Sequence, residues 1–226
     1  MGSLINQYIK RGKFNNALSL YQTMSKSELH YSYINVPLDG HTYVDLIKVC
    51  IEMKDIELGH QIHINVCKLG LIQFDVFVGS TLVDMYAKCG LIFDAKQVLK
   101  KLQVRNVVTW NALIGGLVKI RYGKEALISF QDMKLDHICP DVVTFMYSLK
   151  ACGICIFPEK GREIHSDVAK MGLLKGDPHI ESALVNMYVD CGLLAEAYQV
   201  FVLLNVRDVV TWNTLISGYI QYEHYE

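Results

Sequence analysis

The sequence is short of several features that define common classes of protein. Only four of its 226 residues are proline, so long helices would rarely be interrupted. It contains no run of about 18 apolar residues, the length that a membrane-spanning helix needs. The formal net charge is −1, which argues against a protein that coats nucleic acid through many basic side chains. A basic stripe on one face is still compatible with that charge.

The seven cysteines give no sign of a disulfide framework. Their number is odd and they are scattered along the chain, so reduced thiols in helical cores fit better. With 51% hydrophobic and 20% charged residues, the composition is typical of a soluble protein with ample material for a core. No targeting peptide is visible, since Met1-Gly2-Ser3-Leu4 runs directly into helical sequence.

Signatures of catalysis are also scarce. No glycine-rich phosphate loop is present, and no nucleophile is accompanied by a placed base. The segments 224–226 (His-Tyr-Glu) and 152–155 (Cys-Gly-Ile-Cys) match the two halves of a zinc deaminase motif, but in reversed order. His63 and His165 hold the same phase of a repeat, which favours packing over metal binding. We therefore predict no enzyme activity, no metal and no cofactor for this chain.

What the chain does contain is a repeat at a spacing of 102 residues. Val107–Asn111 returns as Val209–Asn213, and the motif at Met85–Leu91 returns at Met187–Leu193. Such self-similarity is the signature of a stacked repeat protein. An array of this kind has no single pocket, and its chemistry lies in the positions that recur on its exposed concave face.

The long period divides into three shorter units of 35, 36 and 31 residues. In the 35-residue unit 107–141, one apolar face precedes Gly123, a second follows it, and Pro140 comes after both. This pattern predicts two short helices that must stack on neighbouring units to bury their apolar faces. The first face holds Trp110, Leu113, Ile114 and Leu117, and the second holds Ala126, Leu127, Phe130 and Met133.

The motifs in these units resemble those of the pentatricopeptide repeat family. The tetratricopeptide pattern fails at Ile114 and Met133, where it asks for Gly and Ala. The pentatricopeptide consensus matches Val-Val-Thr-Trp-Asn-Ala-Leu-Ile, Lys-Glu-Ala-Leu, Phe-Gln-Asp-Met and Cys-Pro-Asp within 107–141. The motifs Lys-Ala-Cys, Gly-Arg-Glu-Ile-His and Met-Tyr-x-x-Cys-Gly resemble the plant subclass that alternates P, L and S units.

The resemblance covers essentially the whole chain and implies a unit order. The units are P-type 1–39, L-type 40–75, S-type 76–106, P-type 107–141, L-type 142–177, S-type 178–208 and a partial P-type 209–226. The first unit lacks its opening residues and has extra material around Glu28 to Val36, and the last lacks its second helix. The implied fold is an all-α right-handed solenoid of helix–turn–helix repeats, with the first helices lining the concave face.

The resemblance also implies binding of single-stranded RNA at about one base per unit. In the family, the fifth and last residues of a unit read a base edge and the second residue packs against the base. The implied pairs are Ser80 with Asn106 for adenine, Asn111 with Asp141 for uracil, and Ser182 with Asp208 for guanine; Asn213 has no partner. The implied packing residues are Phe77, Val108, His179 and Val210.

The L-type units differ because Val44 and Met146 stand at the fifth position and cannot hydrogen-bond a base edge. The implied RNA core is therefore 5′-A-U-N-G-3′, parallel to the protein. The lysine that contacts phosphate in the family corresponds to Lys10, Lys88 and Lys119. Asp190 stands at the equivalent place in the second S-type unit and reverses the charge, so we expect weak RNA binding.

A structural reading accompanies each of these assignments. Asn111, Asn213, Ser80 and Ser182 lie near helix starts, where such residues commonly cap. The last residues of the units also suit N-caps or turns; they are Asp39, Asp75, Asp141, Asp177 and Asp208. The recurrence at one phase, together with the resemblance, favours base reading. For Trp110 and Trp212 we predict the core, because each lies on an apolar stripe.

The leading hypothesis is a sequence-selective array for single-stranded RNA, part of an RNA-processing or editing factor of the plastid or mitochondrion. A second hypothesis is a scaffold for organellar editing accessory proteins, which Val44, Met146 and the net charge of −1 mildly favour. A third is a homo-oligomer formed through the C-terminal helix, whose apolar residues Leu215, Ile216 and Tyr219 have no second helix to cover them.

Overall fold

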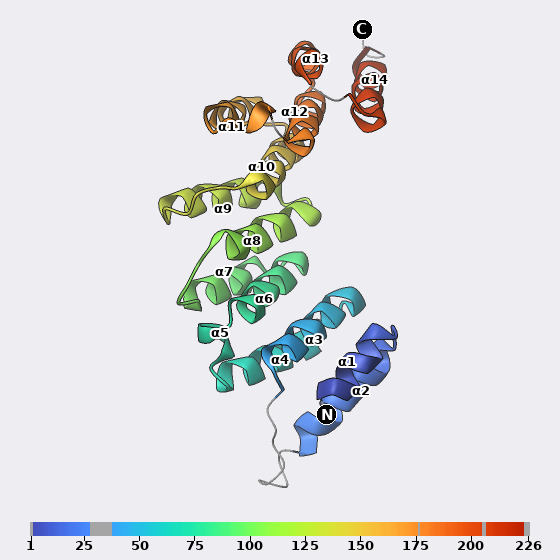
Figure 1. Cartoon of the computed structure of the whole chain (residues 1–226), viewed down its shortest axis with the longest axis vertical. Coiled ribbons are helices and arrows are strands. Elements are labelled where there is room, and N and C mark those ends of the chain that lie inside the picture. The colour runs from blue at the N-terminus through green and yellow to red at the C-terminus, as the bar shows by residue number, and fades with distance from the viewer. Residues whose placement is uncertain (1, 28–37, 176, 205–206, 224–226) are drawn as a thin grey trace. The chain divides into compact units, whose positions relative to one another are not determined.

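The protein is described by a computed structural model that covers residues 2–27, 38–175, 177–204 and 207–223. These residues form fourteen α-helices and one short 3₁₀ turn, and none of them is in a β-strand (Figure 1). None of the helices in the described part is long and apolar enough to cross a membrane. The all-α class that the periodicity predicts is therefore what the chain adopts. The extra material around Glu28 to Val36 lies outside the described residues.

The helices form two compact units, Met1–Arg105 and Asn106–Glu226. In the first unit α3 packs between α1 and α6, while α2, α4 and α7 pack against α1, α3 and α6 respectively. The helix bounds in this unit are α1 Gly2–Lys10, α2 Phe14–Ser27, α3 Gly40–Met53, α4 Ile56–Lys68, α5 Leu71–Phe74, α6 Val76–Lys88 and α7 Ile92–Lys101.

In the second unit alternate helices stack side by side. Helix α10 packs between α8 and α12, and α14 packs against α12, so these four first helices form one layer (Figure 1). Helices α9, α11 and α13 pair with α8, α10 and α12 as a second layer. The bounds are α8 Val107–Lys119, α9 Gly123–Leu135, α10 Val142–Cys155, α11 Pro158–Lys170, α12 Pro178–Asp190, α13 Leu194–Leu203 and α14 Val209–Glu223, with the 3₁₀ turn at Leu173–Lys175.

The apolar faces that the sequence predicts within 107–141 are buried. Leu113, Ile114 and Leu117 of α8 are fully buried, and Trp110 is only 5% exposed. On α9 the side chains of Ala126, Leu127, Phe130 and Met133 are buried as well. The two faces meet each other and the next first helix, because α9 packs against both α8 and α10. Each helix pair therefore completes its core with residues of its neighbour.

The turns between paired helices use glycine where the backbone requires it. Gly90 follows α6 with a φ of 76°, and Gly192 follows α12 with a φ of 73°. Residues with a Cβ are strained in this left-handed region, whereas glycine enters it freely. The recurring Cys-Gly-Leu sequence is thus a helix stop, and it ends α6 and α12 at the same phase of the 102-residue period.

Two recurring motifs form one joint between consecutive repeats. In the first compact unit, a Cβ on Gly59 of α4 would lie 2.5 Å from the Met85 sulfur of α6. One turn further along α4, His63 Nδ1 lies 2.7 Å from the Tyr86 hydroxyl. The missing Cβ of the glycine leaves space for the methionine sulfur, and the histidine forms a hydrogen bond with the tyrosine hydroxyl. The Gly-x-x-x-His motif and the Met-Tyr motif therefore pack against each other.

The same joint recurs 102 residues later. A Cβ on Gly161 of α11 would lie 2.4 Å from the Met187 sulfur of α12, and His165 Nδ1 lies 2.8 Å from the Tyr188 hydroxyl. Burial lowers the pKa of His165, because the surroundings disfavour a charged ring. The matching geometry of both copies gives these histidines a packing role.

Two expectations about buried residues need correction. Trp212 is 47% exposed, although its apolar stripe predicts a place in the core, and its ring meets Phe201 edge-on at 4.6 Å. Trp110 is buried because α9 packs alongside α8, whereas α14 is the last helix that the structure describes. All seven cysteines are free, but only Cys50 and Cys152 are buried in helical cores.

Candidate nucleic-acid interface

The last residue of each repeat unit caps the first helix of the next. The side chains of Asp39, Asp75, Asn106, Asp141 and Asp177 each accept a hydrogen bond from a backbone N–H in the first turn of α3, α6, α8, α10 and α12. Asp208 accepts one from Thr211 in the first turn of α14, at 2.8 Å. The capping interpretation therefore holds at the five aspartates for which the sequence suggested it, and Asn106 caps as well.

Capping occupies only part of each side chain. The hydrogen bonds of Asp141 all reach one carboxylate oxygen, Oδ1, and those of Asp208 likewise reach Oδ1. At Asn106 the carbonyl oxygen accepts from the Thr109 N–H, which turns the amide nitrogen away from the backbone. At Asp141, Asp208 and Asn106, a carboxylate oxygen or an amide nitrogen is thus left over for a ligand.

One predicted pair of base readers is in direct contact. The Asn111 amide nitrogen on α8 donates to Asp141 Oδ1 at 3.0 Å, across the junction between consecutive repeats. The Thr144 hydroxyl lies 2.7 Å from the Asn111 carbonyl oxygen and 2.8 Å from Asp141 Oδ1. Thr144 is fully buried and its N–H also donates to Asp141. These bonds fix the rotamers of Asn111 and Asp141 before any ligand arrives.

The same bonds set the charge of the pair. Burial acts to raise the pKa of the Asp141 carboxyl, but hydrogen bonds from the Thr144 N–H, the Asn111 amide and the Thr144 hydroxyl outweigh it. The pKa of Asp141 is therefore lower than usual, and the group is a carboxylate at neutral pH. Asp208 has a lowered pKa because the Thr211 N–H and hydroxyl donate to it.

The two serines at the fifth position do not cap helices. Ser80 donates to the Phe77 carbonyl oxygen at 3.1 Å, and Ser182 donates to the Pro178 carbonyl oxygen at 2.8 Å. Ser182 is half-buried, whereas Ser80 is only 7% exposed. Each hydroxyl oxygen keeps lone pairs that can accept a further bond. Ser80 belongs to the first compact unit, and Asn106 belongs to the second.

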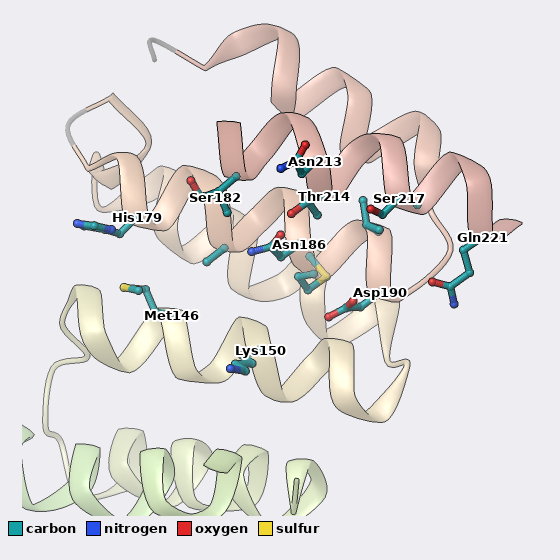
Figure 2. A pocket seen from close by; sticks show the side chains of 15 residues that line it. Met146, Lys150, His179, Ser182, Asn186, Asp190, Asn213, Thr214, Ser217 and Gln221 are labelled. Atoms are coloured by element: carbon teal, nitrogen blue, oxygen red, sulfur yellow. The ribbon is translucent and has the colours of Figure 1, made fainter. Parts of the chain in front are cut away.

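A polar groove runs over the first helices of the second unit. Its volume is about 720 Å³, and it is walled by α10, α12 and α14 (Figure 2). Four residues predicted from the sequence lie in its wall, namely His179, Ser182, Val210 and Asn213. They come from two helices and two repeats, so the structure brings these predicted residues to one surface. Asn213 and His179 are exposed within it.

The residues predicted to pack against bases are open to solvent. Phe77 is 67% exposed, Val210 61% and Val108 50%, and all three follow the N-cap of a first helix by two residues. Exposed apolar side chains at one recurring phase give a base a flat surface to rest on. Val108 and Val210 occupy the same phase of the 102-residue period, and Phe77 and His179 share another.

The positions predicted to contact phosphate differ in charge and in whether the side chain is already paired. Lys10, Lys88 and Lys119 are the last residues of α1, α6 and α8, and Asp190 is the last residue of α12. Lys10 and Lys119 are exposed. Lys88 forms an ion pair with Asp84 one turn earlier on the same helix, so its charge is already partly neutralised.

Asp190 adds a negative group to the wall of the groove. Its carboxylate packs over Gly153 of α10, where a Cβ would lie 2.5 Å from Oδ2. Partial burial raises the pKa of Asp190, while Arg121 and Lys150 act in the opposite direction. This carboxylate would repel a phosphate, which agrees with the charge reversal that the sequence has at this position.

The L-type positions present apolar side chains, as their sequence requires. Met146 lines the groove, and Val44 on α3 is half-buried. Asp177 caps α12 through its bond to the His179 N–H at 2.9 Å. Asp75 caps α6, and its second oxygen lies where a Cβ on Gly40 would be. The first L-type pair therefore offers little free hydrogen-bonding capacity.

Several residues of this surface were missed from the sequence alone. Thr144 supports both members of a reader pair, and its signal was the capping-box spacing Asp-x-x-Thr, which recurs as Asn106-x-x-Thr109. Lys150, Asn186 and Gln221 line the groove. The repeat consensus does not point to these three, because their role depends on the faces that α10, α12 and α14 turn toward one another.

The described residues contain no group of three or more His, Cys, Asp or Glu side chains placed to hold a metal ion. Cys152 is buried, and burial raises the pKa of its thiol to about 12, so it remains a neutral thiol. Its partner in the deaminase-like pattern, the segment 224–226, lies outside the described residues. Cys152 thus has the packing role expected from its place in the helix.

These features define an array of paired helices whose first helices carry polar side chains at a recurring phase. Comparison with known families identifies the array. The PPR repeat family model matches residues 105–153, and the PPR repeat model matches residues 1–29, 80–107 and 210–226, together more than half of the chain. The chain belongs to the pentatricopeptide repeat family.

Relatives with this repeat occur in Arabidopsis thaliana. A chloroplastic pentatricopeptide repeat-containing protein is 38% identical over 177 residues, which are 78% of this chain and 28% of the relative. A mitochondrial one is 33% identical over 98% of this chain and 24% of its own length. A third is 34% identical over 97% of this chain and 24% of its own length. The chain thus spans about a quarter of these relatives.

Solved structures confirm the fold. The crystal structure of the pentatricopeptide repeat protein PPR10, in complex with an 18-nt psaJ RNA element, matches with a TM-score of 0.73 over 97% of this chain and 32% of that one, at 23% identity. A triple cysteine variant of PPR10 with the same RNA element gives the same TM-score. The predicted α-solenoid of helix–turn–helix repeats is therefore the fold of this chain.

Proposed function

We propose that this chain binds single-stranded RNA in a sequence-selective manner along its first helices. The observation that carries the proposal is the Asn111–Asp141 pair, joined at 3.0 Å and held by the buried Thr144. A preformed polar pair at a repeat junction is suited to reading a base edge, since its groups need no reordering. The RNA bound by PPR10, a protein of the same fold, supports the proposal.

The geometry of this pair favours uracil. One amide hydrogen of Asn111 is used by Asp141, and the second can donate to a uracil carbonyl oxygen. The second oxygen of the Asp141 carboxylate can accept the uracil N3–H. Cytosine has an acceptor at N3, which would face the carboxylate and leave both groups unsatisfied. Discrimination against cytosine therefore follows from the charge state of Asp141.

The other two pairs favour purines. Ser182 is shorter than Asn111, so the same carboxylate at Asp208 leaves room for a larger base, and it accepts the N1–H of guanine. At Asn106 the capping bond occupies the carbonyl oxygen, so the amide nitrogen is the free group and can donate to N1 of adenine. With Met146 as a non-reading position, the proposed core is 5′-A-U-N-G-3′.

The test is binding of a short RNA that contains A-U-N-G, measured beside four variants in which one position at a time is changed. We expect each change at A, U or G to weaken binding by about tenfold, equivalent to about 1.4 kcal/mol. A change at N should leave the affinity unaltered. Equal affinity for all variants would overturn the base assignment, and absence of binding at low salt would overturn RNA recognition by this chain.

We propose that the chain is part of an organellar RNA-processing or editing factor with alternating P, L and S units. The support is the set of chloroplastic and mitochondrial names among its relatives and the three unit lengths of the 102-residue period. Imaging of a fluorescent fusion of the full gene product tests the location. Loss of one C-to-U change in a plant lacking the gene tests an editing role.

Self-association is a second candidate, carried by the apolar face of α14. Of the three residues that the sequence left uncovered, Leu215 is buried and Tyr219 is half-buried, because α14 packs against α12 and α13. The exposed apolar face consists instead of Trp212, Ile216 and Ile220, which lie on successive turns of the helix and are each about half exposed or more. We propose that a second copy covers this face with its own α14, since a self-complementary apolar patch closes a twofold dimer. Light scattering over a concentration series should show a dimer that Ile216→Glu abolishes. A monomer at every concentration would exclude it.

A further inference from the structure

The second compact unit, Asn106–Glu226, has few lysines at the positions expected to contact the RNA backbone. At the last position of the first helices, α8 ends in Lys119, whereas α12 ends in Asp190. In the first unit, Lys88 at the end of α6 is already paired with Asp84. The S-type units therefore supply no unengaged cation at this position, although an RNA strand crossing them needs its phosphates neutralised.

A different lysine recurs in the L-type units. Lys48 on α3 and Lys150 on α10 are 102 residues apart, and both are exposed. Neither forms a hydrogen bond or ion pair with any residue that the structure describes. The corresponding position of the S-type units holds Asp84 and Asn186, and that of the P-type unit holds Gly115. A free cation at this place is thus specific to the units that lack base readers.

Lys150 has the right position to follow a strand in the groove. It lies one turn after Met146 on α10, so the two side chains share a helix face (Figure 2). Both residues line the groove together with His179 and Ser182 of α12. Lys48 has the same relation to Val44 on α3. A four-carbon stem gives the ammonium group a reach that the apolar fifth residue lacks.

We infer that Lys48 and Lys150 contact RNA phosphates, so that each L-type unit holds the backbone where it does not read a base. The inference rests on the proposed RNA binding and adds a division of labour to it. P-type and S-type units supply hydrogen bonds to base edges, and L-type units supply charge. The unread N of A-U-N-G would then be the nucleotide whose phosphate is bound most directly by Lys150.

The charge distribution of the groove agrees with this role. Asp190 lies in the same wall, and the Lys150 charge acts to lower its pKa. With Asp190 opposing phosphate and Lys119 at the end of α8, Lys150 is the exposed cation that lines the described groove. A phosphate entering the groove would therefore be drawn toward α10 and away from the end of α12.

The salt dependence of binding tests the inference. Lys150→Ala should weaken binding of every RNA of the A-U-N-G series by a similar factor of several-fold, without changing the preference at A, U or G. It should also reduce the slope of log K against log salt by about 0.7, the value for one phosphate contact on a single strand. Lys124→Ala is the matched control, because it removes an exposed lysine from the second-layer helix α9.

A chemical change in the RNA locates the contact. The phosphates on either side of N are replaced one at a time by neutral methylphosphonates. In the wild-type chain one replacement should weaken binding, and in Lys150→Ala the same replacement should cost nothing further. Lys150→Arg should restore the salt slope, since it returns the positive charge. Circular dichroism of each variant establishes that the helices are intact.

The outcomes separate this inference from the proposed function. If the wild-type chain discriminates among the bases but Lys150→Ala matches Lys124→Ala in affinity and slope, the lysine contact is wrong and base reading stands. If Lys150→Ala changes base preference instead of the slope, the residue reads a base and the inference is again overturned. If the wild-type chain binds no RNA, the proposed function itself fails.

Discussion

At the scale of single residues, the last position of each unit caps a helix and is also proposed to read a base. Asp141 caps α10 through Oδ1 and holds Asn111 through the same oxygen, which leaves Oδ2 for a ligand. The cap contributes about 1 kcal/mol to helix stability, and the free oxygen is the group proposed to select the base. Helix capping and base reading by this residue are therefore compatible interpretations. A substitution that keeps the cap but changes the free group can test base reading separately.

Asp141→Asn should change the preferred base and leave stability almost unaltered. An amide caps a helix about as well as a carboxylate, but it can donate to N3 of cytosine. We expect the preference for uracil over cytosine at this position to fall by about tenfold or to reverse. Competition binding with U and C versions of the RNA measures it. Asp39→Asn is the control, because Asp39 caps α3 in the same way at 2.8 Å from the Thr42 N–H.

Thr144→Val should loosen the same pair. Valine has the shape of threonine but no hydroxyl, so the bonds to Asn111 and Asp141 disappear within a buried site. The free energy of unfolding should fall by about 1 kcal/mol, the usual net value of one hydrogen bond. Urea titration measures this loss. Uracil selectivity should fall as well, and unchanged selectivity would show that Thr144 does not orient the readers.

At the scale of elements, the joint that links α4 to α6, and again α11 to α12, explains why two motifs recur together. The glycine of one helix leaves space for the methionine sulfur of the next helix. The histidine one turn later forms a hydrogen bond with the neighbouring tyrosine hydroxyl. Both contacts link a second helix to the first helix of the following repeat. The motifs are thus needed as a pair, because changing one side alone leaves a clash or an unsatisfied buried group.

Gly161→Ala should destabilise the second joint. Its new methyl group would lie 2.4 Å from the sulfur of Met187, which is only 1% exposed and has little space to move. Overpacking of this kind costs about 1–3 kcal/mol, more than the gain of about 1 kcal/mol in helix propensity. In a Met187→Ala background the same change should cost nothing. Equal losses in both backgrounds, measured by urea unfolding, would argue against the contact.

The buried histidines should make stability depend on pH. Burial lowers the pKa of His63 and His165 below their usual value near 6.5, so the unfolded chain binds more protons over the interval between the two values. The stabilisation is complete above about pH 7, declines as the pH falls below 6.5, and levels off beneath the folded-state pKa. Each full unit of lowering corresponds to about 1.4 kcal/mol.

Urea titrations at pH 7.5, 6.5 and 5.5 measure this decline. The double variant His63→Gln/His165→Gln should show a flatter profile over the same range. His179→Gln is the control, since His179 is exposed and lies in the groove instead of a joint. A wild-type profile no steeper than that of the double variant would show that these histidines do not titrate on unfolding.

The sequence was sufficient for the helix pairs because each apolar face follows the helical period. Trp110, Leu113, Ile114 and Leu117 are buried accordingly. It could not predict the exposure of Trp212, which depends on what packs beside α14. Local spacing did contain the Asp84–Lys88 pair, an i,i+4 arrangement, and the capping boxes. The place of Lys150 required the groove, because three helices far apart in sequence form it.

At the scale of the whole molecule, the balance of charge should limit the affinity of the proposed RNA binding. The net charge is −1, and the second unit has an acidic group where the repeat pattern asks for a lysine. Binding by this chain alone should therefore be weak and only shallowly dependent on salt. The relatives are about four times longer than this chain.

Asp190→Lys should strengthen RNA binding. The substitution removes a repelling carboxylate from the groove and adds a cation at the end of α12. We expect several-fold tighter binding and a slope of log K against log salt that is steeper by about 0.7 or more. Asp136→Lys makes the same charge change at the end of α9 and is the control. Equal gains in both variants would indicate a general charge effect instead of a contact in the groove.

The N-caps have a consequence for how such an array can vary. The residue that caps each first helix is also proposed to face a base. A residue substituted there to change the preferred base must therefore still be able to cap the helix. Asn, Asp, Ser and Thr satisfy both conditions, whereas Gln, Glu, Lys and Arg have the hydrogen-bonding groups but not the short reach. The residue types that can recognise a base at this position are therefore limited to those that can cap a helix, so redesign of the array has few residue types available.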